Sequence, residues 1–143
     1  MDNNYIFQYW EAIQDGTVTV GKWIKTIYEI LVNGLKSGKW DFDEEKANKA
    51  INFIENFCHH SEGRNDLLKL ELWQKAIVSA IFGIMDKRTG YRQFREVFIV
   101  VARKNGKTLF AAAIAAYMAY IDGEYGAKVY FLAPKLDQAD LVY

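Results

Sequence analysis

The sequence is poor in the residues that mark several common classes of protein. Its 143 residues include one cysteine and one proline, and its 18 basic residues balance 18 acidic ones. A single cysteine excludes a disulfide framework and suits a reducing compartment. Zero net charge gives no general attraction to DNA or membranes, so DNA contacts would need a local patch or protein outside this chain. The longest apolar run, 109–121, is too short to span a membrane.

Helical patterns dominate the first part of the chain. Apolar side chains recur at helical spacing over four segments, 4–14, 22–36, 44–58 and 71–84. Gly16 is placed to end the first helix, and Asp43 is placed to cap the third. The polar residues 61–66 indicate a loop, so we predict an N-terminal helical region over 1–66 and a second region over 67–143.

The second region changes in character after a turn at 86–90. Residues 97–101 form a continuous apolar run of β-forming residues, typical of a strand buried on both faces. The segments that follow predict a polar loop, a helix that is apolar almost all round and therefore buried, and a second strand, over 102–106, 107–122 and 128–133. This order predicts a right-handed, parallel βαβ unit.

The predicted fold class is therefore α/β, with a helical N-terminal region followed by the start of a parallel sheet. Two parallel strands do not make a stable sheet alone. Either the helical region covers them or the chain is an incomplete part of a larger α/β domain, and we favour the second interpretation.

The segment Ala102–Thr108 reads Ala-Arg-Lys-Asn-Gly-Lys-Thr and resembles the end of a Walker A phosphate-binding loop (P-loop). Gly106 lets the backbone approach phosphates, and the amides of Lys104, Asn105 and the following helix start can bind them. Lys107 would place a cation on the β- and γ-phosphates, and the Thr108 hydroxyl could ligate Mg²⁺. ATP and Mg²⁺ are therefore the predicted cofactors.

Val101 replaces the first glycine of the general Walker A pattern. The context compensates, because the loop follows a predicted strand and opens a predicted helix. The alternative is a Gly-Lys-Thr helix start that arose by chance.

Arg103 lies four residues before Lys107 in the same loop. Its guanidinium could stabilise charge on the γ-phosphate during transfer. A solvated arginine, or one paired with an acid such as Glu96, explains the loop equally well.

Trp73 and Gln74 precede the predicted loop strand. A glutamine can bind the adenine edge with two hydrogen bonds, and Trp73 could stack on the base or pack beneath it. Spacing alone favours a surface glutamine beside a core tryptophan.

A Walker B acid, which would hold Mg²⁺ and orient water, is not apparent. The acidic segment 41–44 lies upstream of the loop, follows polar residues and is best explained as a helix start. The sequence therefore predicts a phosphate-binding site without visible hydrolytic residues, and leaves open whether this chain is itself an enzyme.

Several segments together resemble one family. They run in order along nearly the whole chain, at 5–16, 41–57, 70–74, 81–83, 103–108 and 133–139. In these segments the sequence resembles the N-terminal part of the large terminase subunit of tailed bacteriophages, the ATP-driven motor that packages DNA. The string Arg-Lys-Asn-Gly-Lys-Thr is specific for one branch of that family, which also lacks the first Walker A glycine.

The resemblance implies a RecA-like ATPase domain followed by a metal-dependent nuclease domain, and an ATPase and endonuclease activity of the parent protein. It implies that Lys107 and Thr108 hold phosphate and Mg²⁺ and that Arg103 is catalytic. It also implies that Gln74 binds adenine and that Gln138 lies where related motors couple nucleotide state to movement. The implied partners are double-stranded DNA, the small terminase subunit, the portal and a ring of further subunits, in the cytoplasm of a bacterial host.

Two other functions remain open. A helicase-type ATPase also begins with a glutamine motif and a P-loop. The second alternative is a nucleotide-binding module that acts through protein contacts. Because such a module does not hydrolyse ATP, it would need no Walker B acid.

Overall fold

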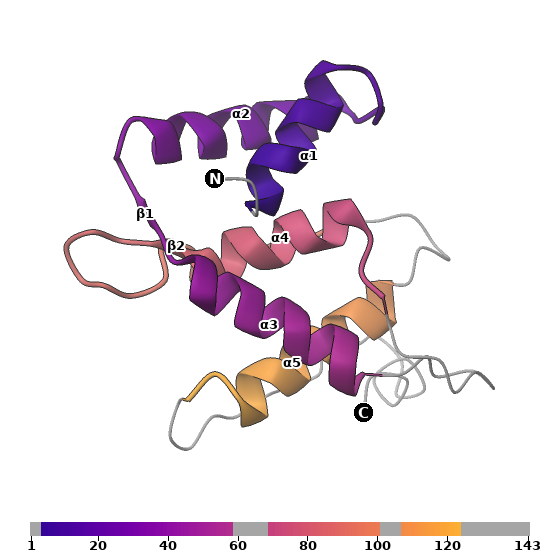
Figure 1. Cartoon of the computed structure of the whole chain (residues 1–143), viewed down its shortest axis with the longest axis vertical. Helices are drawn as coiled ribbons and strands as arrows, with labels where there is room; N and C mark the ends of the chain where they lie inside the picture. Colours follow the sequence, from indigo (N-terminus) through magenta and orange to yellow (C-terminus); the bar gives the residue numbers. More distant parts are fainter. Residues whose placement is uncertain (1–3, 59–68, 101–106, 124–143) are drawn as a thin grey trace. The chain divides into compact units, whose positions relative to one another are not determined.

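A computed structural model describes residues 4–58, 69–100 and 107–123 (Figure 1). The chain forms two compact units, the first made of Met1–Ile51 with Leu70–Val97 and the second of Asn52–Lys69 with Phe98–Tyr143. The described elements follow the order α1, α2, β1, α3, α4, β2, α5. The predicted division at residue 66 lies outside the described residues and stays a prediction.

Local interactions set where α1 (Tyr5–Gln14) begins and ends. At its start, Oδ1 of Asn4 accepts a hydrogen bond from the backbone N–H of Ile6 at 3.0 Å, which satisfies one of the unpaired amides of a helix start. At its end, Gly16 has a φ of +82°, which glycine adopts more readily than other residues. The predicted helix and its glycine stop are both confirmed.

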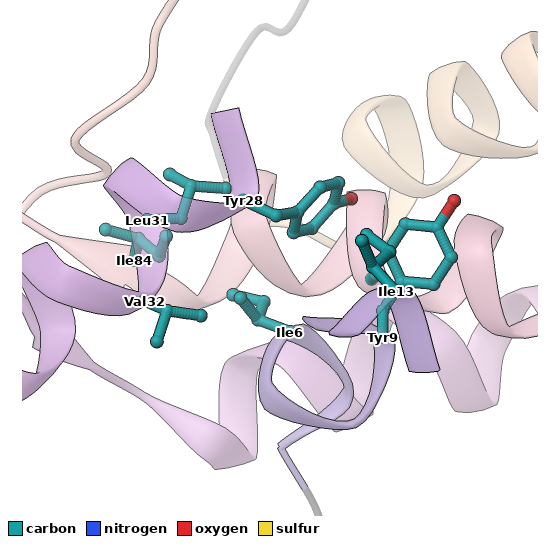
Figure 2. Packing of buried hydrophobic residues seen from close by; sticks show 8 residues of the cluster. Ile6, Tyr9, Ile13, Tyr28, Leu31, Val32 and Ile84 are labelled. Atoms are coloured by element: carbon teal, nitrogen blue, oxygen red, sulfur yellow. The ribbon is translucent and has the colours of Figure 1, made fainter. Parts of the chain in front are cut away.

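The core of the first unit lies between three helices and a short strand. α1 packs on both α2 (Lys22–Lys36) and α4 (Leu72–Gly83). Tyr9 and Tyr28 meet edge to face, with ring centroids 4.9 Å apart, a favourable arrangement of two aromatic quadrupoles. The buried cluster, shown in Figure 2, consists of Ile6, Tyr9, Ile13, Tyr28, Leu31, Val32, Ala76 and Ile84.

A two-stranded antiparallel sheet joins β1 (Asp41–Phe42) to β2 (Ile84–Met85). Neither strand is predicted from the sequence, because two residues are too few to show an alternating pattern. Gly83 directly precedes β2, and a Cβ at this position would lie 2.5 Å from Cε2 of Phe42. This close approach requires glycine at the end of α4.

Asp43 begins α3 (Glu44–Phe57) as the sequence predicts. Its Oδ1 accepts a hydrogen bond from the backbone N–H of Lys46 at 3.0 Å. The apolar side of the helix is buried at Ala47, Ala50, Ile51 and Ile54, but Phe57, which continues the same spacing, is 71% exposed, so the predicted stripe is wrong at that position. The division between the two units falls within α3, between Ile51 and Asn52.

In the second unit, α5 (Lys107–Tyr120) begins at the predicted lysine. Phe110, Ala113 and Tyr117 are buried, at helical spacing, and the Tyr117 ring lies 5.6 Å from that of Phe53. Tyr120 is 83% exposed, so the prediction that this helix is buried almost all round is wrong. Half of its apolar residues are alanines, which expose little apolar area, and one buried side is therefore sufficient.

The predicted buried strand at 97–101 is also wrong for its described part. Residues 97–100 form no strand, and Phe98 is 92% exposed. A strand is stabilised by hydrogen bonds to neighbouring strands. Within the described ranges no strand pairs with this segment, and its predicted partner 128–133 lies outside them. The described sheet is antiparallel, and the described elements do not include a parallel βαβ unit.

Candidate functional site

The start of α4 carries two of the predicted site residues, Trp73 and Gln74. Glu71 is the N-cap residue, with an extended backbone at φ −74° and ψ 164°. Oε1 of Gln74 accepts a hydrogen bond from the backbone N–H of Glu71 at 2.9 Å. The arrangement is a capping box, which satisfies amides that a helix start leaves unpaired. Gln74 is 9% exposed, so the prediction of a surface glutamine from spacing is wrong.

The indole of Trp73 is held by the same residue. Its Nε1 donates a hydrogen bond to Oε2 of Glu71 at 2.6 Å. The ring is half-buried and packs against the core cluster of the first unit. Glu71 thus contacts both candidate adenine-binding residues, one through its backbone and one through its carboxylate.

Sequence analysis does not identify Glu71 as part of this site. The signal that reveals it is the spacing Glu71-x-x-Gln74, which places a carboxylate at the N-cap and an amide at the third helical position. The spacing becomes informative once the start of α4 is known to lie at Leu72.

Contacts along α4 fix the helix that carries Gln74. Nζ of Lys75 lies 5.1 Å from the centre of the Tyr5 ring on α1, within the range of a cation–π interaction. Ala76, Val78 and Phe82 are each at most 2% exposed. The start of α4 therefore rests on a packed core rather than on a loop.

The remaining predicted residues belong to the loop before α5 and to its first turn. Arg103, Lys104, Asn105 and Gly106 lie outside the described residues. Lys107 and Thr108 are the first two residues of α5, as the phosphate-binding pattern requires.

The first turn of α5 contains no acidic residue. The partial positive charge at a helix start is therefore not neutralised from within that turn and favours an anion. α3 differs, because Asp43 caps it and Glu44 and Glu45 occupy its first turn. The start of α3 is consequently a poor phosphate site, and the sequence at α5 suits one better.

The acidic segment 41–44 lines a shallow cavity of about 390 Å³ together with Met85, Asp86, Lys87 and Gly90. Two carboxylates of the lining have partners: Asp41 lies 3.7 Å from Nζ of Lys87, and Asp86 accepts a hydrogen bond from the backbone N–H of Arg88 at 2.8 Å. Across the described ranges, no three or more Asp, Glu, His and Cys side chains form a group that could hold a metal ion. The interpretation of 41–44 as a helix start is confirmed for Asp43 and Glu44, whereas Asp41 and Phe42 form β1.

Comparison with protein families assigns part of this chain. Residues 72–143 match the family model of the terminase large subunit, ATPase domain. The match covers half of the chain, starts at the first residue of α4 and includes all of α5. The resemblance identified from the sequence motifs is confirmed. No curated protein and no solved structure matches the chain. Within the described residues, no helix is long and apolar enough to cross a membrane.

Proposed function

The chain belongs to the family of terminase large subunit ATPase domains, and from this premise we propose that it binds ATP with Mg²⁺ for a motor that packages double-stranded DNA. The observation that carries the proposal is the start of α5 at Lys107, inside the matched region and directly after the loop sequence. A lysine at the first position of a helix, following a Gly-containing loop, is the arrangement by which P-loops hold phosphates.

Each residue of the loop has a distinct role in the proposal. Lys107 would pair with the β- and γ-phosphates, and the Thr108 hydroxyl would supply a ligand to Mg²⁺. Arg103 stabilises the charge that develops on the γ-phosphate. The backbone amides of Lys104, Asn105 and Gly106 would supply further hydrogen bonds to the phosphates.

Gln74 supplies recognition of the base in the same proposal. Its amide reads the adenine edge, and the tethered indole of Trp73 supports the base or the helix start beneath it. The buried position of Gln74 supports this role, because a fixed amide loses less conformational freedom on binding than a solvated one.

The proposal extends to the motor. The proposed partners are those of a packaging motor: double-stranded DNA, the small terminase subunit, the portal and further copies arranged in a ring. The proposed site of action is the cytoplasm of a bacterial host.

Calorimetric titration of ATP–Mg²⁺ into the full chain tests the nucleotide site. We expect Lys107→Ala to weaken ATP binding by at least about tenfold, because it removes a charge-assisted contact to phosphate. Lys22→Ala is the matched control, because Lys22 is likewise the first residue of a helix, α2, and should leave binding unchanged. Equal affinity of the wild type and Lys107→Ala would contradict the proposal.

A second variant tests the metal separately. Thr108→Val keeps the shape of the side chain and removes its hydroxyl. We expect it to weaken ATP binding in Mg²⁺ and to bind like the wild type in EDTA. The same loss in both conditions would argue against a role for Thr108 as a metal ligand.

A further inference from the structure

We propose that the backbone N–H of Glu71 sets the direction of the Gln74 amide and thereby makes the base site prefer adenine to guanine. The inference rests on the proposed function, since it assigns a specificity-determining group to the same nucleotide site. Glu71 acts here as a positioning residue, because it contacts Gln74 rather than the base.

The geometry identifies the two ends of the amide. Oε1 of Gln74 accepts the Glu71 N–H at 2.9 Å, and the side chain is almost completely buried. A carbonyl oxygen has two lone pairs, so Oε1 retains one acceptor site beside this bond. Nε2, at the other end of the amide, carries only donors. The bond to the Glu71 N–H therefore fixes which end of the Gln74 amide is the acceptor, Oε1, and which end is the donor, Nε2.

This order matches adenine and disfavours guanine. The edge of adenine offers a donor at N6 and an acceptor at N7, which pair with Oε1 and Nε2 respectively. Guanine also has the N7 acceptor but presents the acceptor O6 in place of the N6 donor. Oε1 held by the cap would then face another acceptor, and turning the amide over would break the bond to Glu71.

The carboxylate of Glu71 adds a second anchor. It accepts the Trp73 indole N–H at 2.6 Å, and that ring packs against the core cluster. The N-cap residue is thereby held from both sides, and its N–H keeps a constant direction relative to α4. The bond from the Glu71 N–H to Gln74 and the bond from Trp73 to the Glu71 carboxylate thus link the proposed base-binding amide to a ring packed on the core of the first unit.

Substitution by proline separates the backbone contact from the carboxylate. Glu71 has a φ of −74°, which proline adopts without strain, and Leu70 before it lies outside any helix, as a residue before proline prefers. Glu71→Pro removes both the N–H and the carboxylate, whereas Glu71→Ala removes only the carboxylate. The difference between the two variants reports the contribution of the N–H.

Binding of ATP and GTP to the full chain, measured by calorimetry in Mg²⁺, gives the selectivity of each variant. We expect the wild type to prefer ATP, and Gln74→Ala to reduce that preference by roughly 5- to 150-fold, the range for one base-discriminating pair. We expect Glu71→Pro to reduce it at least about fivefold more than Glu71→Ala. Melting curves followed by circular dichroism establish that each variant is folded at the temperature of the titration.

The outcomes distinguish this inference from the function on which it rests. A wild type that does not bind ATP, or a Gln74→Ala variant that keeps full selectivity, contradicts the adenine site itself. A different outcome contradicts only the role of the N–H. In that outcome the wild type prefers ATP and Gln74→Ala loses the preference, but Glu71→Pro and Glu71→Ala have equal selectivity.

Hydrogen exchange of the Glu71 amide provides an independent test that needs no nucleotide. We expect Gln74→Ala to accelerate exchange at this amide, because the substitution removes its acceptor. An unchanged exchange rate would show that the bond is absent in solution and would overturn the inference.

Discussion

The two units of the chain differ in how completely local contacts account for their structure. The first unit has capped helix starts at Asn4, Asp43 and Glu71 and a shared apolar core. In the second unit, α5 buries one side, and the segment before it leaves Phe98 92% exposed. The candidate base contacts belong to the first unit and the candidate phosphate contacts to the second. The comparison shows that capped helix starts and a shared core fix the first unit, whereas α5 in the second unit is held along one side.

The largest expected effect tests the core of the first unit. Ile6 is completely buried in the cluster between α1, α2 and α4. We expect Ile6→Ala to lower the free energy of unfolding by about 2–5 kcal/mol, because it removes apolar contacts and leaves a cavity. Urea unfolding followed by circular dichroism measures this loss.

The matched control for that variant is Ile27→Ala. Ile27 is 53% exposed on α2, and its truncation should change stability by less than about 0.5 kcal/mol. Similar losses for the two variants would mean that the first unit is not organised around the cluster.

The dependence of the free energy of unfolding on pH in the alkaline range tests the same core. Burial, and secondarily the neighbouring Tyr9, raises the pKa of the Tyr28 hydroxyl above its ordinary value. The unfolded chain therefore releases this proton at a pH where the folded chain keeps it. Stability is complete below the unfolded pKa of about 10 and falls by up to about 1.4 kcal/mol per pH unit above it.

Tyr28→Phe should make this alkaline loss shallower, as measured by urea unfolding at about pH 8 and about pH 11. Part of the loss should remain, because burial also raises the pKa of Tyr9. Tyr120→Phe, at an exposed position of the second unit, should leave the slope unchanged. An unaltered slope for Tyr28→Phe would show that Tyr28 ionises freely in the folded chain.

Removal of the cap at α4 should have a moderate effect. We expect Glu71→Ala to destabilise the first unit by about 1 kcal/mol, because the helix start loses a capping group and the Trp73 indole loses its acceptor. Glu29→Ala, within the exposed face of α2, is the control for loss of a carboxylate. If both variants have wild-type stability, the α4 start is preorganised by its core contacts alone.

The smallest expected effect lies in the second unit. We expect Phe98→Ser to change the free energy of unfolding by less than about 0.5 kcal/mol, because the ring is 92% exposed. Ile54→Ser, which removes a fully buried side chain of the same unit, is the contrasting variant. A loss of several kcal/mol for Phe98→Ser would instead show that this ring is buried in solution.

Helix periodicity explains why most of the fold was predictable. In the part of the chain that the structure describes, all five helices begin and end within two residues of the positions indicated by apolar spacing, Gly16 and Asp43. The two-residue strands could not be predicted, because their pairing depends on contacts between segments about 40 residues apart. The segment 97–100 has strong β propensity, yet propensity produces a strand only when backbone partners are present.

The candidate site was predictable only in part. The residue types at 103–108 indicate phosphate chemistry, and the start of α5 at Lys107 agrees with the predicted helix boundary. Trp73 and Gln74 were identified, but the burial of Gln74 and its bond to Glu71 were not. Those features depend on the exact start of α4, and helix boundaries are the least certain part of a prediction from sequence.

The cap on Gln74 also bears on how such a site can change during evolution. The donor is a backbone amide, and every amino acid except proline provides one. Substitutions at position 71 other than proline therefore keep the donor of that bond, although those that lack a carboxylate lose the acceptor that holds the Trp73 indole. The backbone contact by itself imposes no residue type on position 71.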